Sequence, residues 1–150
     1  MYYVIIFIAT GCYSGYLPKA PGTWGSLVGL AIFFLLHNLS VPVYLAATAA
    51  IFLIGLFAAG EAEKIMDRKD PGLVVIDEIA GMLVTMIAAP AAPLIMVLGF
   101  ILFRIFDILK PFPIRLIDQR IHGGLGIMLD DIVAGLYSLI ILQLVIRFIL

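Results

Sequence analysis

The chain has 150 residues, of which 64% are hydrophobic and 13% are charged, and its formal net charge is −1. Soluble domains carry roughly 45–50% apolar and about 25% charged residues, so we interpret the chain as a single domain of an integral membrane protein. The alternative is a small helical protein that buries its surface in an oligomer. The lack of a basic excess argues against a nucleic-acid partner, and a single cysteine, Cys12, excludes an internal disulfide and a cysteine-based zinc cluster.

The first half of the chain predicts a short apolar element and a helical hairpin. The opening stretch, MYYVIIFIATG, contains no positive charge, so it lacks the start of a secretory signal. Residues 23–38 and 41–60 are apolar and are separated by Leu39 and Ser40. Pro42 stands where a second helix would begin. We therefore expect two antiparallel helices over these ranges.

The second half predicts another hairpin and a last helix. Pro90 and Pro93 interrupt an apolar run that would otherwise be long enough for one membrane crossing. We expect one helix over residues 73–89, a second over 91–110, and a C-terminal helix over 132–150. The predicted fold class is all-α, a compact helical membrane bundle of about five helices, two hairpins plus the C-terminal helix.

The charges are gathered in a few regions. Lys19, residues 61–78 and residues 104–131 carry almost all of them, and outside these regions only Arg147 is charged. Two helices separate each charged region from the next in this topology, so all three would share one membrane face. Because most lysines and arginines lie there, the positive-inside rule makes that face cytoplasmic. The sequence thus predicts one polar site at one face of the bundle.

Two pairs of acids stand next to apolar runs. Asp77-Glu78 in DEIAG and Asp130-Asp131 in DDIVAG are both expected in the first turn of a helix, where acids also serve as caps. Together with Asp107 they would repel one another strongly at one face unless a cation bound there. Carboxylate oxygens favour Mg²⁺ over Mn²⁺ or Ca²⁺ in this setting.

Basic residues accompany these acids. Arg104, Asp107 and Lys110 are spaced to share one helical face, either as an interfacial salt-bridge ladder or as part of a site. The turn-rich loop around Lys19 precedes a helix, where backbone amides can cradle phosphate, although a plain reverse turn explains it equally well. His122 stands in a predicted flexible loop, HGGLG, and is either a general acid/base or simply solvated.

Four motifs, in order, carry a resemblance. PKAPGTWGS, DEIAG, FRIFDILKPFPIRLID and GGLGIMLDDIVAG resemble the phosphatidylglycerophosphatase A family over residues 10–137. The resemblance implies Mg²⁺-dependent hydrolysis of the terminal phosphate of phosphatidylglycerophosphate, which yields phosphatidylglycerol in glycerophospholipid biosynthesis. It also implies one lipid-phosphatase domain over residues 1–150 in the bacterial inner membrane, multi-pass, with the active site facing the cytoplasm. Its partners would be the phospholipid substrate and membrane lipids, with association into homo-oligomers left open.

The resemblance and the charge pattern together assign roles to nine residues, some of them in more than one role. The expected metal ligands are Asp77, Glu78, Asp107, Asp130 and Asp131; the expected catalytic residues are Asp130, Asp131, Asp107, Lys19 and Arg104; the expected substrate-binding residues are Lys19, Thr23, Arg104 and Lys110.

Two questions stay open. The nucleophile is either water or an aspartate, Asp130 or Asp107. The rival functions are a small cation-binding transporter or channel subunit, whose charges would lie near the membrane midplane, and a purely structural helical partner protein.

Overall fold

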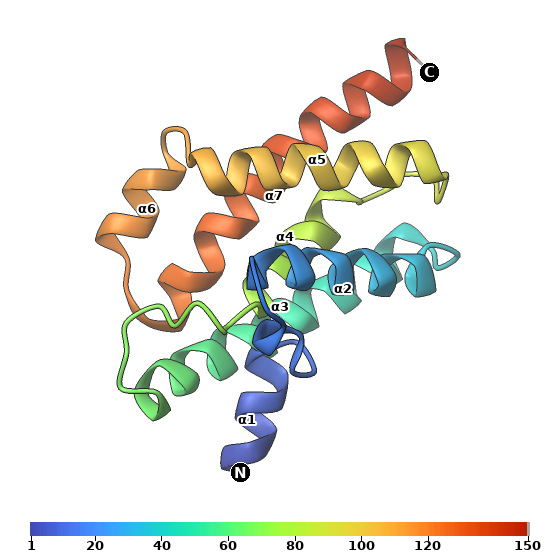
Figure 1. Cartoon of the computed structure of the whole chain (residues 1–150). Helices are drawn as coiled ribbons and strands as arrows, with labels where there is room; N and C mark the ends of the chain where they lie inside the picture. Colours follow the sequence, from blue (N-terminus) through green and yellow to red (C-terminus); the bar gives the residue numbers. More distant parts are fainter. Residues whose placement is uncertain (150) are drawn as a thin grey trace.

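The computed structural model describes residues 1–149, which form helices and connecting segments without a β-strand (Figure 1). The all-α class is confirmed. The expected number of about five helices is wrong, because the described residues form seven α-helices and one 3₁₀-helix. In chain order the elements are α1 (Tyr2–Ala9), η1 (Ser14–Tyr16), α2 (Pro21–Leu36), α3 (Val41–Ile65), α4 (Ile76–Thr85), α5 (Pro93–Leu109), α6 (Ile114–Arg120) and α7 (Gly123–Phe148).

Two short helices, α1 and α6, account for the difference. α1 packs against α3 and buries Ile5, Ile6 and Ala9. The amide of Val75 donates to the carbonyl of Ala9 at 2.9 Å, which ties α1 to the segment before α4. α6 follows Lys110, whose left-handed backbone ends α5, and it packs against α7. Helices of seven or eight residues span about two turns, too few for a clear periodic signal.

The longer helices follow the predicted hairpins with shifted ends. α3 continues beyond residue 60 through the charged sequence EAEKI to Ile65. α7 starts at Gly123 rather than at residue 132, so Asp130 and Asp131 lie well inside the helix and not in its first turn. The predicted last residue of this helix, Leu150, lies outside the described residues.

Within the segment HGGLG only His122 lies outside a helix, because residues 123–126 form the first turn of α7, which corrects the expected flexible loop. The glycines allow backbones to approach closely instead. A Cβ atom on Gly124 would lie 2.0 Å from the carbonyl oxygen of Leu56 on α3. A Cβ atom on Gly126 would lie 2.2 Å from the carbonyl oxygen of Ile121. Gly124 therefore lets the first turn of α7 dock on α3.

α4 forms the centre of the fold and is shorter than the predicted 73–89. Every residue from Ile79 to Thr85 is buried, and the helix packs chiefly on α7 and α2. The break between α4 and α5 exposes carbonyl groups that side chains satisfy. The hydroxyl of Tyr44 donates to Leu83 O at 2.7 Å, and Nε2 of Gln143 donates to Ile87 O at 2.7 Å.

The contact between α4 and α7 brings the two acid pairs together. A Cβ atom on Gly135 would lie 2.5 Å from the carbonyl oxygen of Gly81, so only glycine fits where these helices touch. Figure 1 shows α7 crossing the molecule obliquely, from beside α6 to beyond α5. Its path carries Asp130 and Asp131 past the start of α4, where Asp77 and Glu78 lie.

The surface is unusually apolar. α3 and α7 have 25 and 26 residues and are long and apolar enough to cross a membrane. Large apolar side chains on α3, α5 and α7 are exposed, among them Phe57, Ile108 and Ile140. Soluble monomers rarely expose so much contiguous apolar surface. The lengths of α3 and α7 and this exposed apolar surface both agree with the membrane protein that the hydrophobic composition predicts.

Candidate active site

Three carboxylates from two helices meet at one point. Asp77 and Glu78 occupy the first turn of α4, and Asp131 comes from the interior of α7. One oxygen of each lies within 4.8 Å of an oxygen of the other two. The close contact of α4 with α7 thus places side chains that are 53 or 54 positions apart in the sequence within reach of one ion.

One oxygen of each carboxylate is buried without a hydrogen-bond partner. Asp77 Oδ1, Glu78 Oε2 and Asp131 Oδ2 are inaccessible to solvent and accept no hydrogen bond within residues 1–149. Burial, with the nearby charges of Asp131 and Asp107, raises the pKa of Glu78 to about 8. Burial and the charge of Glu78 raise the pKa of Asp77 as well. Buried charges are costly unless they are paired or coordinate a metal, so this donor set fits a divalent cation.

Two further acids of the expected metal set have cation partners. Arg104 Nη1 forms an ion pair with Asp107 Oδ2, and both side chains are largely buried. Lys110 Nζ lies 2.6 Å from Asp130 Oδ2. The structure therefore brings all five acids to one region but divides them: Asp107 and Asp130 are neutralised by cations of the chain, and the other three are not.

Lys110 is held from two sides. Its ammonium also donates to Asp118 Oδ1 on α6 at 3.0 Å. Burial works against the charge of Lys110, but the hydrogen bonds to Asp130 and Asp118 outweigh it and raise the pKa of the ammonium above its ordinary value. Lys110 remains a fixed positive charge next to the carboxylate cluster.

The N-terminus of α2 closes the site. A Cβ atom on Gly22 would lie 2.2 Å from Glu78 Oε1 and 2.9 Å from Arg104 Nη1. The Ser26 hydroxyl accepts a hydrogen bond from Arg104 Nη1 at 3.5 Å and donates to the carbonyl of Gly22 at 2.8 Å. The loop of the PKAPGTWGS motif, α4 and α5 thus meet around one arginine.

Lys19 and Thr23 flank Gly22 in the sequence: Lys19 precedes it by three positions and Thr23 follows it directly. Lys19 is exposed, has a left-handed backbone conformation with φ of 62°, and forms no ion pair with any residue of the described chain. Thr23 is partly buried in the first turn of α2. The structure places both near the α2 terminus without a direct bond to the carboxylates among residues 1–149.

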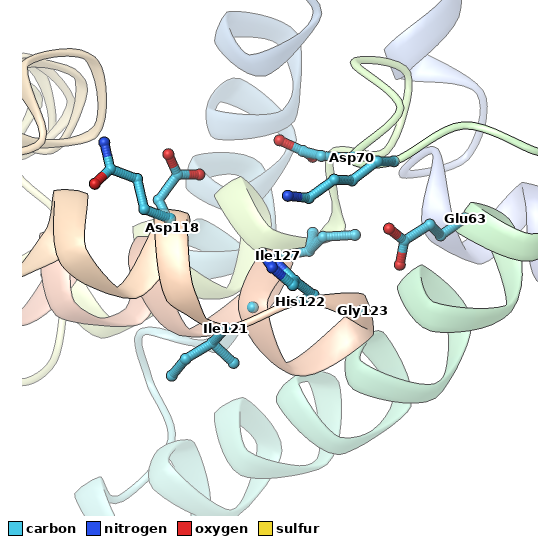
Figure 2. A pocket seen from close by; sticks show the side chains of 10 residues that line it. Glu63, Asp70, Asp118, Ile121, His122, Gly123 and Ile127 are labelled. Atoms are coloured by element: carbon cyan, nitrogen blue, oxygen red, sulfur yellow. The ribbon is translucent and has the colours of Figure 1, made fainter.

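A cleft of about 400 Å³ opens beside the cluster. Figure 2 shows Asp118 and Glu63 on opposite sides of this cleft, with His122 between them. None of the three unpaired carboxylates lines the cleft. His122 is exposed and precedes the first turn of α7, so it belongs to the cleft and not to the cluster.

Three residues of this region were absent from the predicted site. Gly22 and Ser26 belong to the PKAPGTWGS motif, and Asp118 ends the FRIFDILKPFPIRLID motif. The signal in the sequence that could have indicated these three residues was their position inside those motifs. A glycine that permits a close approach and an acid that holds a lysine have no chemical signature of their own, so only coordinates reveal their contacts.

The fold and this site define a class of protein. It is an all-helical protein with two helices of membrane-crossing length, in which carboxylates able to bind a metal lie beside cations able to bind phosphate. Comparison with known proteins narrows the class. The chain belongs to the phosphatidylglycerophosphatase A family, whose family model matches residues 7–146.

Curated relatives agree with this membership. The chain is 42% identical over 139 residues to the phosphatidylglycerophosphatase A of Haemophilus influenzae, with 91% of this chain and 85% of the relative covered. It is 41% identical over 132 residues to the Escherichia coli phosphatidylglycerophosphatase A, with 87% and 77% covered. A Bacteroides thetaiotaomicron protein, provisionally named a phosphatidylinositol-3-phosphatase, is 37% identical over 145 residues, with 91% and 90% covered. No solved structure matches the chain. The family resemblance seen in the sequence is confirmed.

Proposed function

We propose that this chain hydrolyses phosphatidylglycerophosphate to phosphatidylglycerol and inorganic phosphate. The observation that carries the proposal is the cluster of Asp77, Glu78 and Asp131, each with one buried oxygen that accepts no hydrogen bond, next to Arg104 and Lys110. The names of the Haemophilus influenzae and Escherichia coli relatives supply the substrate.

Asp77, Glu78 and Asp131 would hold the metal, and Mg²⁺ is the ion proposed. Hard carboxylate oxygens suit Mg²⁺, and a phosphate-binding Mg²⁺ site commonly uses few carboxylates and the substrate's own oxygens. The bound ion supplies positive charge at the phosphoryl oxygens and acidifies water. Asp107 and Asp130, which the sequence placed in the metal set, act instead as partners of the two cations.

The cations bind and orient the terminal phosphate in this proposal. Arg104 is held by Asp107 and Ser26, so its guanidinium is fixed before substrate arrives. Its planar fork can contact two phosphoryl oxygens at once. Lys110 would also contact the phosphate. Lys19, just before α2, and Thr23, in its first turn, would supply the remaining phosphate contacts. Hydrolysis breaks the bond between phosphorus and the terminal glycerol oxygen, while these cations offset the charge that spreads over the phosphoryl oxygens.

The bundle would lie in the bacterial inner membrane, multi-pass, with this site at the cytoplasmic face. Support comes from α3 and α7, which are long enough to cross, and from the exposed apolar side chains around them. Residues 79–103, which run from α4 through the break into α5, contain no charged residue. A transporter would be expected to place cation-binding acids at such a broken helix, so the enzyme is favoured. Residues 1–150 would form one lipid-phosphatase domain.

The test is phosphate release by the purified protein in detergent–lipid micelles that contain phosphatidylglycerophosphate. We expect release with Mg²⁺ that stops when a chelator is added and returns when Mg²⁺ is restored. Phosphatidylinositol 3-phosphate serves as the comparison substrate, because the Bacteroides relative is named for it. No release from phosphatidylglycerophosphate with Mg²⁺, Mn²⁺ or Ca²⁺ would refute the proposal. Faster hydrolysis of phosphatidylinositol 3-phosphate would mean that the inositol lipid, and not phosphatidylglycerophosphate, is the preferred substrate.

A further inference from the structure

A second groove lies beside Lys110 and shares one lining residue, Gln119, with the acidic cleft. It has a volume of about 430 Å³ and is formed where α5 ends and α6 begins. One wall is apolar and the rest carries two cations and an amide. The lining residues are Leu109, Lys110, Pro111, Phe112, Arg115, Leu116 and Gln119.

The apolar wall suits the boundary between water and lipid. Leu109 is 71% exposed and Phe112 is 80% exposed, at the same end of the molecule as the carboxylate cluster. Aromatic and long aliphatic side chains at this level usually contact lipid where headgroups and acyl chains meet. A lipid standing beside α5 would thus have its headgroup at the mouth of the groove.

The polar wall leads from that mouth to the carboxylates. Lys110 lines the groove, and its ammonium lies 2.6 Å from Asp130, the neighbour of Asp131. Arg115 also lines the groove, is exposed, and forms no ion pair with any residue in the part of the chain that the structure describes. The groove therefore offers one cation that is paired with Asp130 and a second cation, Arg115, that has no acidic partner there.

We propose that this groove binds the phosphodiester of the lipid headgroup, the phosphate that is retained in the product, and that Arg115 is its principal contact. The inference rests on the proposed function. A lipid substrate that carries a terminal phosphate beyond a glycerol has a second negative charge, one glycerol closer to the membrane. Arg115 is a free guanidinium placed to receive that charge, and arginine binds phosphate oxygens in a bidentate way.

The neighbouring acidic cleft is a poor place for this phosphate. Glu63, Asp70 and Asp118 line it, against Lys69 and His122. Carboxylates repel a phosphodiester, whereas the groove of Arg115 contains no acid among its lining residues. Charge complementarity thus assigns the retained phosphate to the groove.

The experiment compares Arg115→Gln with Arg120→Gln in the Mg²⁺-dependent assay on phosphatidylglycerophosphate. Arg120 is an exposed arginine of the same helix that does not line the groove, so its replacement removes the same charge. We expect Arg115→Gln to raise KM at least about five-fold, because a charge-assisted hydrogen bond from the guanidinium to the phosphodiester is lost, with kcat within about two-fold. Arg115→Lys should restore most of the affinity because the charge is retained. Arg120→Gln should leave KM within about two-fold of wild type, because Arg120 does not line the groove.

Phosphatidic acid supplies the second comparison, because its phosphomonoester is attached directly to diacylglycerol and no phosphodiester is present. The wild-type protein should bind it more weakly than phosphatidylglycerophosphate or not hydrolyse it. An unchanged KM for Arg115→Gln, an equal rise for Arg120→Gln, or equal wild-type KM values for the two lipids would overturn the inference. A wild-type protein that releases no phosphate from phosphatidylglycerophosphate would instead refute the proposed function.

Discussion

Asp131→Asn is expected to reduce phosphate release by about a thousand-fold or more, since loss of a metal ligand removes several kcal/mol of transition-state stabilisation. Asp131 contributes the only ligand from α7 to the cluster, so its loss leaves Asp77 and Glu78 from adjacent positions on α4. Asparagine has nearly the same shape but no charge. Single-turnover and steady-state phosphate release with Mg²⁺ in excess measure the effect.

The same substitution should stabilise the protein when no metal is present. Asp131 is 3% exposed, and its Oδ2 has no hydrogen-bond partner within residues 1–149. Replacing one of three clustered acids relieves the desolvation and repulsion that also raise the pKa values of Asp77 and Glu78, and we expect this to contribute about 2 kcal/mol, or roughly 4–8 °C in the midpoint of thermal unfolding. Thermal unfolding in a chelator should therefore show Asp131→Asn above wild type, and Mg²⁺ should raise the midpoint of wild type alone.

Asp67→Asn is the matched control for this variant. Asp67 is exposed in the turn after α3, with a left-handed backbone that asparagine tolerates well. Its activity and midpoint should equal those of wild type. If Asp131→Asn keeps activity within ten-fold of wild type, or loses stability in the chelator, Asp131 is not one of three unpaired ligands.

Gly22→Ala is expected to reduce kcat about a hundred-fold, because a misplacement of about 1 Å can cost that much. The added methyl would lie 2.2 Å from Glu78 Oε1 and 2.9 Å from Arg104 Nη1. Both are the ends of flexible side chains, so the fold can accommodate the methyl by moving them. The atoms that move belong to Glu78 and Arg104, which are proposed to bind the ion and the phosphate. Steady-state kinetics with phosphatidylglycerophosphate measure the effect.

Gly22→Ala should keep the stability of wild type although its kcat falls. Gly22 lies in the first turn of α2 and has no positive φ, and alanine favours a helix over glycine by up to about 1 kcal/mol. The midpoint of unfolding should thus remain within a few degrees of wild type. Gly72→Ala, where a methyl meets no atom within 4 Å, is the control for the substitution itself and should be fully active. A Gly22→Ala protein with normal kcat would mean that α2 does not close the site.

The sequence predicted the meeting of distant charged regions because charge is costly in lipid. Pro90 and Pro93 implied a hairpin, and the hairpin placed Asp77 and Asp131 at one face. The structure brings them within 4.8 Å of each other. This part of the site was predictable from composition and topology alone, without knowledge of side-chain contacts.

Which of the five acids form ion pairs with cations of the chain was not predictable in the same way. Spacing places Asp107 near both Arg104 and Lys110 on one helical face, but Lys110 turns away because its backbone is left-handed and ends α5. It reaches Asp130 and Asp118 instead. Which acid receives a cation depends on this one backbone conformation and on α6, a seven-residue helix that periodicity could not reveal.

The role of the glycines was also outside what the sequence shows. HGGLG was expected to be a flexible loop, since glycines lower helix propensity. In the structure Gly124 and Gly135 let α7 approach Leu56 and Gly81, so these glycines shape contacts between helices. Packing overrides propensity where a backbone must approach another backbone, and a single sequence does not show which glycines do so.

Asp77, Glu78 and Asp131 are proposed to share one divalent ion. The most direct test is a crystal structure of the protein with Mn²⁺ in place of Mg²⁺, in which anomalous scattering locates the ion. We expect one Mn²⁺ peak with an oxygen from each of these three residues at about 2.1 Å, and the peak should vanish in Asp131→Asn. A peak on Asp130 or Asp107 without the three, or no peak at a Mn²⁺ concentration that supports activity, would contradict it.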